Sequence, residues 1–531
     1  MPAGKPERER TPEKEMTNKY ALLSVFDKTG IVDFARVLDK LGYKIISTGG
    51  TAKTLLDAGI TVVPIQDITG NPESFDGRMK TISFQAEGGI LFDRENPSHV
   101  MQAKDLGIKP IDLVVCNLYP FEQTIAKPNA SFEDAVENID VGGPTMVRAA
   151  AKNFKNVLVV VDPKDYEKVA KGLEENSIDQ GFRRALAAKA FGHLSFYDSQ
   201  IARFLNKQDA PEFLTIPGRN SITLRYGENP HQRAVVYLEP NTNSPLAKLQ
   251  RLGGKELGMV NLLDISAGIE VIRLFPKNPC SVVIKHGNPS GAGLGETSYQ
   301  AMIRSIKGDQ ESAFGGIIVN NRSIGIEDAK ALAELGAMMD IFAAPSITPE
   351  AVEFILKQRK DETGIYSFGE IPSRRSNPRQ IKSFDGGFIV QEWNDSVESN
   401  FPNWQLVTNT TPTPKQTELA YFGWLLSSRI KSNTVLIVDS KVPMTRGIGS
   451  GQTSRVLATK IALERAGEHA RGGIMISDSF FPFDDSVKLA AKYGIGLIVQ
   501  QGGSKRDKDS IKAANDTGIP MFFTGQRSFW H

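Results

Sequence analysis

Apolar residues recur with two alternating periods along the N-terminal part of the chain. A short apolar run covers residues 20–25, and after a turn at 27–30 the apolar positions follow a helical period at Ile31, Phe34, Ala35, Leu38 and Leu41. Further strand-like runs are found at 44–47, 61–65, 112–119 and 157–162, with helical segments between them. Strands that alternate with helices predict an α/β domain with a parallel, doubly wound sheet.

The second half of the chain shows the same kind of pattern. Buried strands are predicted at 280–284, 316–319, 434–438 and 496–499, again separated by helices. A helix is predicted over 178–205, and the stretch that follows it contains Pro211 and Pro217, which are typical of a connection. We expect a first domain with a helical extension at 18–205, a linker at 206–218 and a second α/β region at 219–531.

Length and charge narrow the class of protein. A chain of 531 residues is too long for one ordinary core, which predicts at least two domains. Because 63 basic residues nearly balance 61 acidic ones, the global charge favours neither nucleic acid nor an anionic membrane as a partner. No apolar run approaches the roughly 20 residues that span a bilayer.

The cysteine content and the first 17 residues indicate the cellular compartment in which the protein works. Only Cys116 and Cys280 are present, far apart in sequence, which is typical of a reducing compartment and predicts a cytoplasmic protein. Residues 1–17 mix both charges with proline and fit neither a secretory signal nor a transit peptide. We expect them to form a disordered tail.

Two glycine-rich segments precede predicted helices in the first domain. One runs from Ser47 to Thr51, and the other is Asp140-Val141-Gly142-Gly143, which leads into a helix that carries Lys152. Backbone amides at a helix N-terminus bind phosphate readily, so the pair favours an anionic small molecule. A glycine turn that serves only tight packing explains either segment equally well.

Three more polar residues of the first domain are candidates for the same site. Arg78 and Lys80 alternate in the string DGRMKT, and Tyr119 closes a strand, where ligands of open α/β sheets usually bind. A solvated basic pair is the alternative for Arg78 and Lys80. Tyr119 is equally consistent with a core aromatic residue.

In the second half, Lys285 and His286 follow a buried strand and lead into a glycine-rich turn. The neighbouring lysine disfavours the imidazolium form, so His286 is a candidate neutral base. A structural histidine is the alternative. The chain has no CxxC, no HExxH, no Walker loop and no HxE with PCxxC, so neither a metal site nor a zinc deaminase is predicted.

An ordered series of strings resembles the bifunctional family that joins aminoimidazole carboxamide ribotide (AICAR) formyltransferase to inosine monophosphate (IMP) cyclohydrolase. The strings are SVFDKTG, STGGTA, GRMKT, CNLYPF, ENIDVGGPTMVRAAAKN, LRYGENPHQ, VIKHGNPSG, SAFGGII, KSN, GIGSGQTSR, SDSFFPFDD and TGQRSFWH. The resemblance implies an N-terminal methylglyoxal-synthase-like cyclohydrolase domain and a transformylase of two cytidine-deaminase-like subdomains without zinc. It also implies 10-formyltetrahydrofolate as formyl donor, with no catalytic metal, and a homodimer whose transformylase site is shared.

The resemblance also implies residue roles. For formyl transfer these are His286 as base, Lys285 as stabiliser of developing charge and Asn433 as orienting group, with nucleotide contacts from Arg225, Tyr226, Arg455 and Arg527. For ring closure the family positions are Lys80 on the oxyanion and Tyr119, Asp140 and Lys152 in the surrounding polar cluster. The remaining positions would hold phosphate, namely Ser24, Lys28, Thr48, Gly50, Thr51 and Arg78.

The sequence departs from the family pattern at a few positions. Phe26 replaces a serine, and the segment KTISFQAEGG after Arg78 and Met79 lacks two histidines of the family. GMVN at 258–261, QGGS at 501–504 and RSF at 527–529 replace SYNN, PGGS and RHF. A second hypothesis therefore keeps the transformylase and makes the first domain a phosphate-ligand-binding module without catalysis. Retention of Lys80, Tyr119, Asp140 and Lys152 favours an active cyclohydrolase.

Overall fold

The computed structural model describes residues 19–336, 338–359, 362–395 and 397–531. The tail predicted at 1–17 lies outside the described residues. The chain divides into two compact units between residues 219 and 220, and residues 239–241 belong to the first unit. Over the described ranges, no helix is long and apolar enough to cross a membrane.

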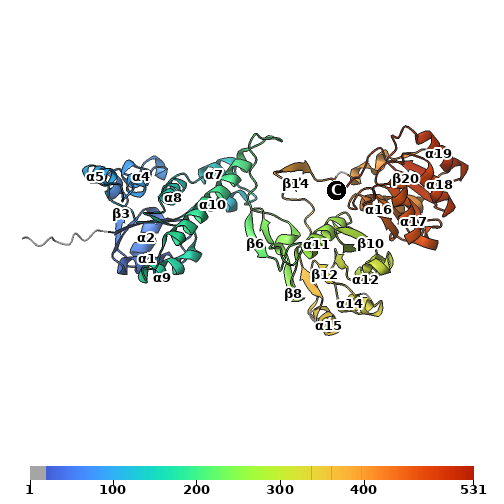
Figure 1. Ribbon diagram of the computed structural model, residues 1–531, viewed down its shortest axis with the longest axis horizontal. Helices are drawn as coiled ribbons and strands as arrows, with labels where there is room; N and C mark the ends of the chain where they lie inside the picture. The colour runs from blue at the N-terminus through green and yellow to red at the C-terminus, as the bar shows by residue number, and fades with distance from the viewer. Residues whose placement is uncertain (1–18, 337, 360–361, 396) are drawn as a thin grey trace, which may run out of the picture. The chain divides into compact units, whose positions relative to one another are not determined.

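The first unit is built on a five-stranded sheet with the order β3-β2-β1-β4-β5, and every neighbouring pair is parallel. The predicted parallel, doubly wound α/β sheet is confirmed. Figure 1 shows α1 and α9 on one side of this sheet and α4 and α8 on the other. The strands are β1 (Lys19–Val25), β2 (Tyr43–Ser47), β3 (Val62–Pro64), β4 (Leu113–Asn117) and β5 (Leu158–Val160).

The helices of the first unit cover both faces of the sheet because the strands are apolar on both sides and are almost fully buried. Asp179 caps the long α10 by accepting a hydrogen bond from the Phe182 N–H at 2.7 Å. The helices are α1 (Ile31–Lys40), α2 (Gly49–Asp57), α3 (Gln66–Thr69), α4 (Phe84–Leu91), α5 (Pro97–Asp105), α6 (Phe121–Ile125), α7 (Phe132–Glu137), α8 (Gly142–Lys152), α9 (Tyr166–Glu174) and α10 (Gln180–Leu205).

The second unit contains two six-stranded mixed sheets. The first has the order β10-β9-β11-β12-β13-β8, and the second has β18-β17-β19-β20-β21-β16. The strands of the first are β8 (Gln250–Gly254), β9 (Cys280–Lys285), β10 (Asn288–Leu294), β11 (Ile317–Asn320), β12 (Ile341–Ala344) and β13 (Gly364–Ser367). Those of the second are β16 (Gln405–Leu406), β17 (Val435–Val438), β18 (Thr445–Gly449), β19 (Ile474–Ser477), β20 (Leu497–Gln500) and β21 (Met521–Phe523).

The two sheets are copies of one topology. In each, a helix precedes a strand that forms an antiparallel hairpin with the edge strand. A third strand pairs antiparallel with the other side of that strand, and two further strands then add in parallel to the third. An antiparallel strand closes the far edge of each. The first copy uses α11 (Met259–Ile272), α12 (Ser298–Lys307), α13 (Gln310–Ala313), α14 (Ile326–Glu334) and α15 (Pro349–Arg359). The second uses α16 (Pro414–Ser427), α17 (Arg455–Ala466), α18 (Asp485–Lys492) and α19 (Asp507–Asp516).

The copies join at their edge strands, β10 and β18. Gly293 and Met444 form an antiparallel bridge, and the Ala292 N–H donates to the Thr445 hydroxyl at 3.0 Å. Glycines let a helix lie directly on each edge strand: a Cβ at Gly291 would stand 2.0 Å from the Ser305 carbonyl oxygen of α12, and one at Gly449 would stand 2.1 Å from the Ala458 carbonyl oxygen of α17. The NPSGAG segment therefore forms a strand that packs under a helix.

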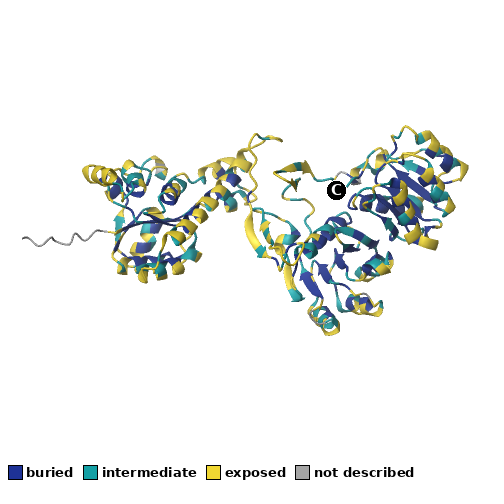
Figure 2. Cartoon of the chain, viewed as in Figure 1, coloured by how far each residue is buried: buried dark blue, intermediate teal, exposed yellow. Residues whose placement is uncertain are grey.

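Two small hairpins lie outside these sheets. One pairs β6 (Arg219–Thr223) with β7 (Val235–Leu238), and the other pairs β14 (Arg379–Phe384) with β15 (Gly387–Glu392). Figure 2 shows the six-stranded sheets buried in dark blue, whereas the hairpin of β14 is largely exposed.

Candidate functional sites

The first candidate site is a cavity of about 730 Å³ in the first unit. It opens at the carboxyl ends of β1 and β4, where the strand order reverses direction and where ligands of open parallel sheets bind. The structure brings nine of the predicted residues to its lining: Ser24, Lys28, Thr48, Gly50, Thr51, Arg78, Lys80, Tyr119 and Asp140.

One end of the cavity is the N-terminus of α2, flanked by two ammonium groups. Lys28 Nζ lies 3.6 Å from the point where a Cβ would stand at Gly50, and Lys80 Nζ lies 3.8 Å from the corresponding point at Gly49. The first intrahelical bond runs from the Ala52 N–H to the Thr48 carbonyl, so the preceding amides point out of the helix. Two lysines beside the positive end of a helix suit a phosphate.

The Thr51 hydroxyl is used inside the protein. It accepts a hydrogen bond from the Val25 N–H at 3.0 Å and donates to the Val25 carbonyl at 2.9 Å, and the side chain is buried. This hydroxyl ties the start of α2 to the end of β1. A phosphate at this position would therefore meet Thr51 through its backbone amide.

Both predicted cations of the DGRMKT string have carboxylate partners. Lys80 Nζ lies 2.9 Å from Glu73 Oε1, and Arg78 forms an ion pair with Glu137. The Arg78 side chain is exposed, whereas the Lys80 side chain is about a quarter exposed and faces the cavity. An incoming anion at Lys80 therefore competes with Glu73.

Asp140 and Tyr119 also line the cavity. Asp140 Oδ1 accepts from the Gly143 N–H at 2.8 Å, and burial raises the pKa of this carboxyl although backbone N–H groups of Gly143 and Tyr119 lower it. Phe26, which replaces the family serine, lies edge-on to the Tyr119 ring at 5.9 Å between centroids. A carboxyl that holds its proton more tightly than usual beside a phenol can donate or accept a proton.

Lys152 and Asn117 differ from the expectation in opposite ways. Lys152 is the exposed last residue of α8, whereas the cavity lining extends along that helix only as far as Met146, so Lys152 does not join the polar cluster. Asn117, which was not predicted, lines the cavity and accepts from the Phe26 and Asp27 N–H groups at 2.6 and 2.9 Å. Its only sequence signal is its position at the end of a strand.

The segment that lacks the two family histidines forms a helix start. Ser83 caps α4 by accepting from the Ala86 N–H at 3.0 Å, and Ile82 lines the cavity. Glu87, where the family has a histidine before two glycines, lies inside α4, and burial raises the pKa of its carboxyl to about 7. The segment is thus ordered packing beside Lys80.

The second candidate site is centred on the turn between β9 and β10. His286 and Gly287 both have positive φ, at 55° and 75°, and Lys285 pairs with Asn288 across this two-residue turn. Such values are typical of a type I′ hairpin turn, in which both central residues are left-handed. The turn presents the exposed His286 at its tip, and Lys285 Nζ donates to the Phe314 carbonyl at 2.8 Å.

Asp264 of α11 holds this turn from behind. Its Oδ1 accepts from the Gly287 N–H at 2.6 Å, and its carboxylate also accepts from the His286 backbone. Burial raises the pKa of this carboxyl, while the two backbone bonds and the charges of His286 and Lys431 lower it. Asp264 was not predicted; a carboxylate within the apolar stretch 259–272 was the available signal.

The loop before β17 lies beside the same turn. Lys431 Nζ is 3.8 Å from the point where a Cβ would stand at Gly287, and the Lys431 N–H donates to Asn288 Oδ1 at 3.1 Å. Asn433, two residues later, donates from Nδ2 to the Gln452 carbonyl at 2.8 Å. Lys285, His286, Lys431 and Asn433 therefore belong to one cluster, and Lys431 adds a cation that was not predicted.

Arg455 was expected to bind nucleotide, but its guanidinium is buried in internal contacts. It donates to Asn433 Oδ1 at 2.6 Å and to the Thr434 carbonyl at 3.0 Å, and it forms an ion pair with Asp478. Only 8% of the residue is exposed. These contacts fix the amide of Asn433, so the structure gives Arg455 a positioning geometry.

The other predicted nucleotide contacts lie at two further places. Arg527 is exposed on the C-terminal segment, whose Trp530 carbonyl accepts from the Ser432 N–H at 2.9 Å. Arg225 and Tyr226 belong to a loop that lies beside the start of α11: the Met259 N–H of that helix donates to the Tyr226 carbonyl at 3.1 Å. A Cβ at Gly258 would stand 2.9 Å from the Tyr226 ring, so glycine there admits this ring position.

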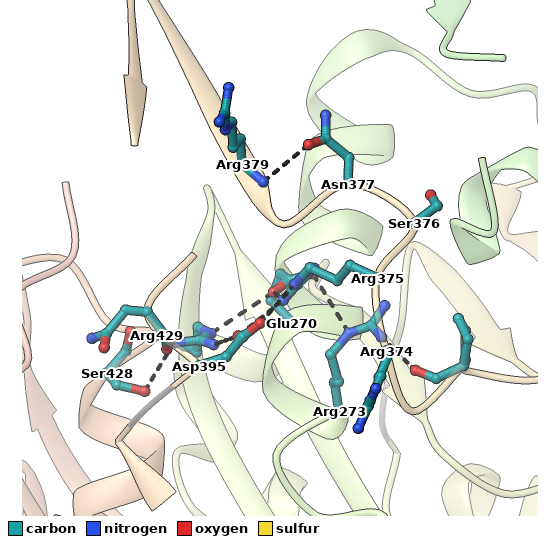
Figure 3. A network of polar contacts seen from close by, with 12 residues as sticks. Glu270, Arg273, Arg374, Arg375, Ser376, Asn377, Arg379, Asp395, Ser428 and Arg429 are labelled. Carbon is teal, nitrogen blue, oxygen red and sulfur yellow. Dashed lines mark hydrogen bonds and ion pairs between the residues drawn. The ribbon is translucent and has the colours of Figure 1, made fainter. Parts of the chain in front are cut away.

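A network of arginines and carboxylates, buried except for Asp395, supports the loop of Asn433 (Figure 3). Glu270 of α11 accepts from Arg375, whose Nε donates to Asp395 at 3.1 Å; Asp395 in turn accepts from Arg429 at 3.0 Å. Arg429, two residues before Lys431, is 3% exposed and lies over the Trp530 ring at 5.2 Å. The network thus connects α11, the segment before β14 and the C-terminal residues to the loop before β17.

In the part of the chain that the structure describes, no group of three or more His, Cys, Asp or Glu side chains is arranged to hold a metal ion. Both cysteines are buried, and burial raises the pKa of each thiol.

Comparison with known proteins matches both units. The family model described as AICARFT/IMPCHase bienzyme matches residues 150–465, and the MGS-like domain model matches residues 30–145. The chain is 44% identical to the bifunctional purine biosynthesis protein PurH of Halalkalibacterium halodurans, covering 97% of this chain and 100% of that protein. It is 42% identical to PurH of Persephonella marina, with the same shares. The crystal structure of ForH is 39% identical over 36% of this chain and all of that chain, with a TM-score of 0.32.

Proposed function

The chain belongs to the AICARFT/IMPCHase bienzyme family, and from this membership we propose which of its two sites catalyses each reaction. The protein is a bifunctional AICAR formyltransferase and IMP cyclohydrolase, which carries out the last two steps of de novo purine synthesis. The family implies a folate formyl donor. We assign ring closure to the cavity of the first unit and formyl transfer to the cluster around His286.

For ring closure, the ribotide phosphate binds at the N-terminus of α2 beside Lys28. The carboxamide nitrogen then attacks the formamide carbon, and the oxyanion forms within reach of the Lys80 ammonium. Asp140 and Tyr119 move the protons that leave with water, since burial raises the pKa of the Asp140 carboxyl and makes it a better proton acceptor than an exposed aspartate. The observation that carries this assignment is that two ammonium groups beside the start of α2 line the same cavity as Asp140 and Tyr119.

For formyl transfer, His286 removes the proton from the ribotide amine as this weak nucleophile attacks the formyl carbon. Lys285 and Lys431 stabilise the charge that develops on the formyl oxygen, and Asn433 orients the substrate carboxamide. 10-Formyltetrahydrofolate supplies the formyl group as a co-substrate: the bond between the formyl carbon and the folate nitrogen breaks, and that nitrogen takes up a proton as tetrahydrofolate leaves. The exposed imidazole and two ammonium groups of the cluster fit an anionic ribotide and a folate with its carboxylates.

We further propose a cytoplasmic homodimer in which two chains share each transformylase site. The two small hairpins bear exposed apolar side chains, including Phe384 and Ile389, and an isolated hairpin is only marginally stable in water. The likeness of the two copied sheets to cytidine deaminases is likewise a proposal. Dilution should lower formyl transfer per chain if the site is shared, and full activity of a demonstrated monomer would contradict it.

The experiment that tests the assignment supplies AICAR and 10-formyltetrahydrofolate to the full chain. We expect IMP to form without lasting accumulation of the formamido ribotide, because dehydration to an aromatic ring draws a reversible transfer forward. Accumulation of the formamido ribotide, with no closure above the uncatalysed rate, would instead favour the hypothesis of a non-catalytic first domain.

A further inference from the structure

A second cavity lies in the second unit, away from the His286 cluster. Its volume is about 550 Å³, and we call it the junction cavity because both copied sheets contribute to it. It is bounded by the segment before β9, the residues after β10, the turn between β17 and β18, and one face of α16. Its lining includes Phe275, Lys277, Arg304, Lys415, Tyr421 and Lys441.

The duplicated topology makes the junction cavity the counterpart of the formyl-transfer site. The catalytic cluster combines the β9–β10 turn with the loop before β17. In the duplicated topology, the β17–β18 turn is equivalent to the β9–β10 turn, and the loop before β9 is equivalent to the loop before β17. These two equivalent segments line the junction cavity, at residues 441–443 and 274–278. The supporting helix exchanges as well: α11 carries Asp264 behind the catalytic turn, and α16 carries Glu418 in the cavity lining.

The two sites are nevertheless separate. β9 begins at Cys280 beside the junction cavity and ends at Lys285 in the catalytic cluster. A strand of six residues places its ends about 17 Å apart, at roughly 3.3 Å for each step. A small ligand in the junction cavity therefore does not reach His286.

The cavity has an apolar floor and a cationic rim. Phe275 and Phe422 are buried with ring centroids 5.4 Å apart, and Tyr421 lies beside them in the lining. Lys277 and Lys441 are exposed at the rim, and neither forms an ion pair with any residue that the structure describes. Four cations and two carboxylates line the cavity in all: Lys277, Arg304, Lys415, Lys441, Glu296 and Glu418.

We propose that the junction cavity is a second small-molecule site that binds an anion carrying an aromatic or heterocyclic ring. The ring lies on the aromatic floor, and the phosphate or carboxylate meets Lys277 and Lys441. A volume of 550 Å³ is within the range of roughly 300–1,000 Å³ that small-molecule sites occupy. A nucleoside monophosphate and a folyl glutamate both have this chemistry.

Thiol protection tests the proposal locally. Asn278 is exposed in the cavity lining, and the two native cysteines are buried, so Asn278→Cys supplies an accessible thiol at the site. Labelling of this thiol by a maleimide is timed in the full chain with IMP, with folyl triglutamate, with inosine and with inorganic phosphate. Lys357→Cys, exposed on α15 and outside the cavity lining, is the matched control.

We expect IMP or folyl triglutamate to slow labelling of Cys at 278 about tenfold at ten times its Kd, with no change at 357. The added change Lys441→Ala should remove most of that protection, and whichever of the two compounds protects identifies the source of the ligand. The proposal fails if neither compound protects at millimolar concentration, if protection survives in Lys441→Ala, or if both positions slow equally. Protection by inosine as strong as by IMP overturns the anion requirement, and protection by inorganic phosphate alone overturns the ring requirement.

Discussion

In the cavity of the first unit, most groups that face the ligand follow a strand end or precede a helix: Tyr119 comes just after β4 and Asp140 just before α8, whereas Lys80 lies on a loop. In the cluster of the second unit, the exposed turn and loop are held from behind by buried side chains such as Asp264, Arg455 and Arg429. The first arrangement follows from the sheet topology itself, whereas the second depends on polar contacts several residues away from the chemistry. The formyl-transfer site should therefore be more sensitive to substitutions that never touch substrate.

The largest expected effect separates the two sites completely. His286→Ala should lower formyl transfer by roughly 100- to 10,000-fold, since a positioned general base contributes about that much. Ring closure of supplied formamido ribotide should stay at the normal rate, because His286 and the cavity of the first unit are in different compact units. Both rates are measured on one preparation. A variant with near-normal folate-dependent turnover would remove His286 from its role.

The converse change is Lys80→Ala in the first unit. Loss of an oxyanion donor costs about 3 to 4 kcal/mol in barrier height, so ring closure should slow by roughly 100- to 1,000-fold while formyl transfer is unchanged. Lys104→Ala, an exposed lysine of α5 outside the cavity lining, is the matched control and should have no effect. Phe84→Ala, in the segment without the family histidines, should change affinity more than turnover. A silent Lys80→Ala would make the first unit a binding module.

A smaller effect tests whether the arginine–carboxylate network positions the loop before β17 for formyl transfer. Asp395→Asn weakens the bonds to Arg375 and Arg429, and we expect kcat for formyl transfer to fall about 10- to 100-fold, since misplacement of reacting groups by about 1 Å costs that much. Glu464→Gln, in a surface ion pair of α17, is the control.

A merely structural network would leave a different signature. If Asp395→Asn lowered the melting temperature but left kcat per folded chain intact, the network would stabilise the unit without positioning the loop. Arg375→Lys should retain a higher kcat for formyl transfer than Arg375→Met, because lysine keeps one charged hydrogen bond to Glu270. Equal kcat in these two variants would contradict a positioning role.

The sequence predicted the elements more successfully than the roles of their side chains. Strands expected at 20–25 and 44–47 are found at Lys19–Val25 and Tyr43–Ser47, because apolar periodicity records burial directly. Thr51 and Arg455 carry side chains that suit phosphate, yet the fold uses both internally. No local pattern records such partners, since they are brought together only by tertiary packing.

The duplication of the two six-stranded sheets also could not be predicted from local sequence patterns. The two copies share strand order and direction, but no fixed-period repeat is visible in the sequence. Topology depends on which strands pair, and different side chains can satisfy the same pairing. Asp264 and Lys431 became recognisable only once the β9–β10 turn and the loop before β17 were placed side by side.

The smallest expected effect concerns Glu87, which sharpens the contrast because it alters the first unit alone. Its Oε1 is buried with no hydrogen-bond partner among the described residues, and burial raises the pKa of the carboxyl from 4.5 to about 7. A pKa that is higher in the folded state means that the protonated form stabilises the fold. That stability is complete below about pH 4.5 and is lost as pH rises through 7. At pH 8 the folded unit therefore carries a partly buried carboxylate, at a cost of about 1 to 2 kcal/mol once solvent screening is included. Glu87→Gln should raise the melting temperature of the first unit at pH 8 by several degrees and leave it nearly unchanged at pH 4.5, with the exposed Glu174→Gln as control. Melting curves at the two pH values decide the matter: an equal shift at both, or a loss of stability at pH 8, would show that the Glu87 carboxylate has a favourable partner in the folded unit.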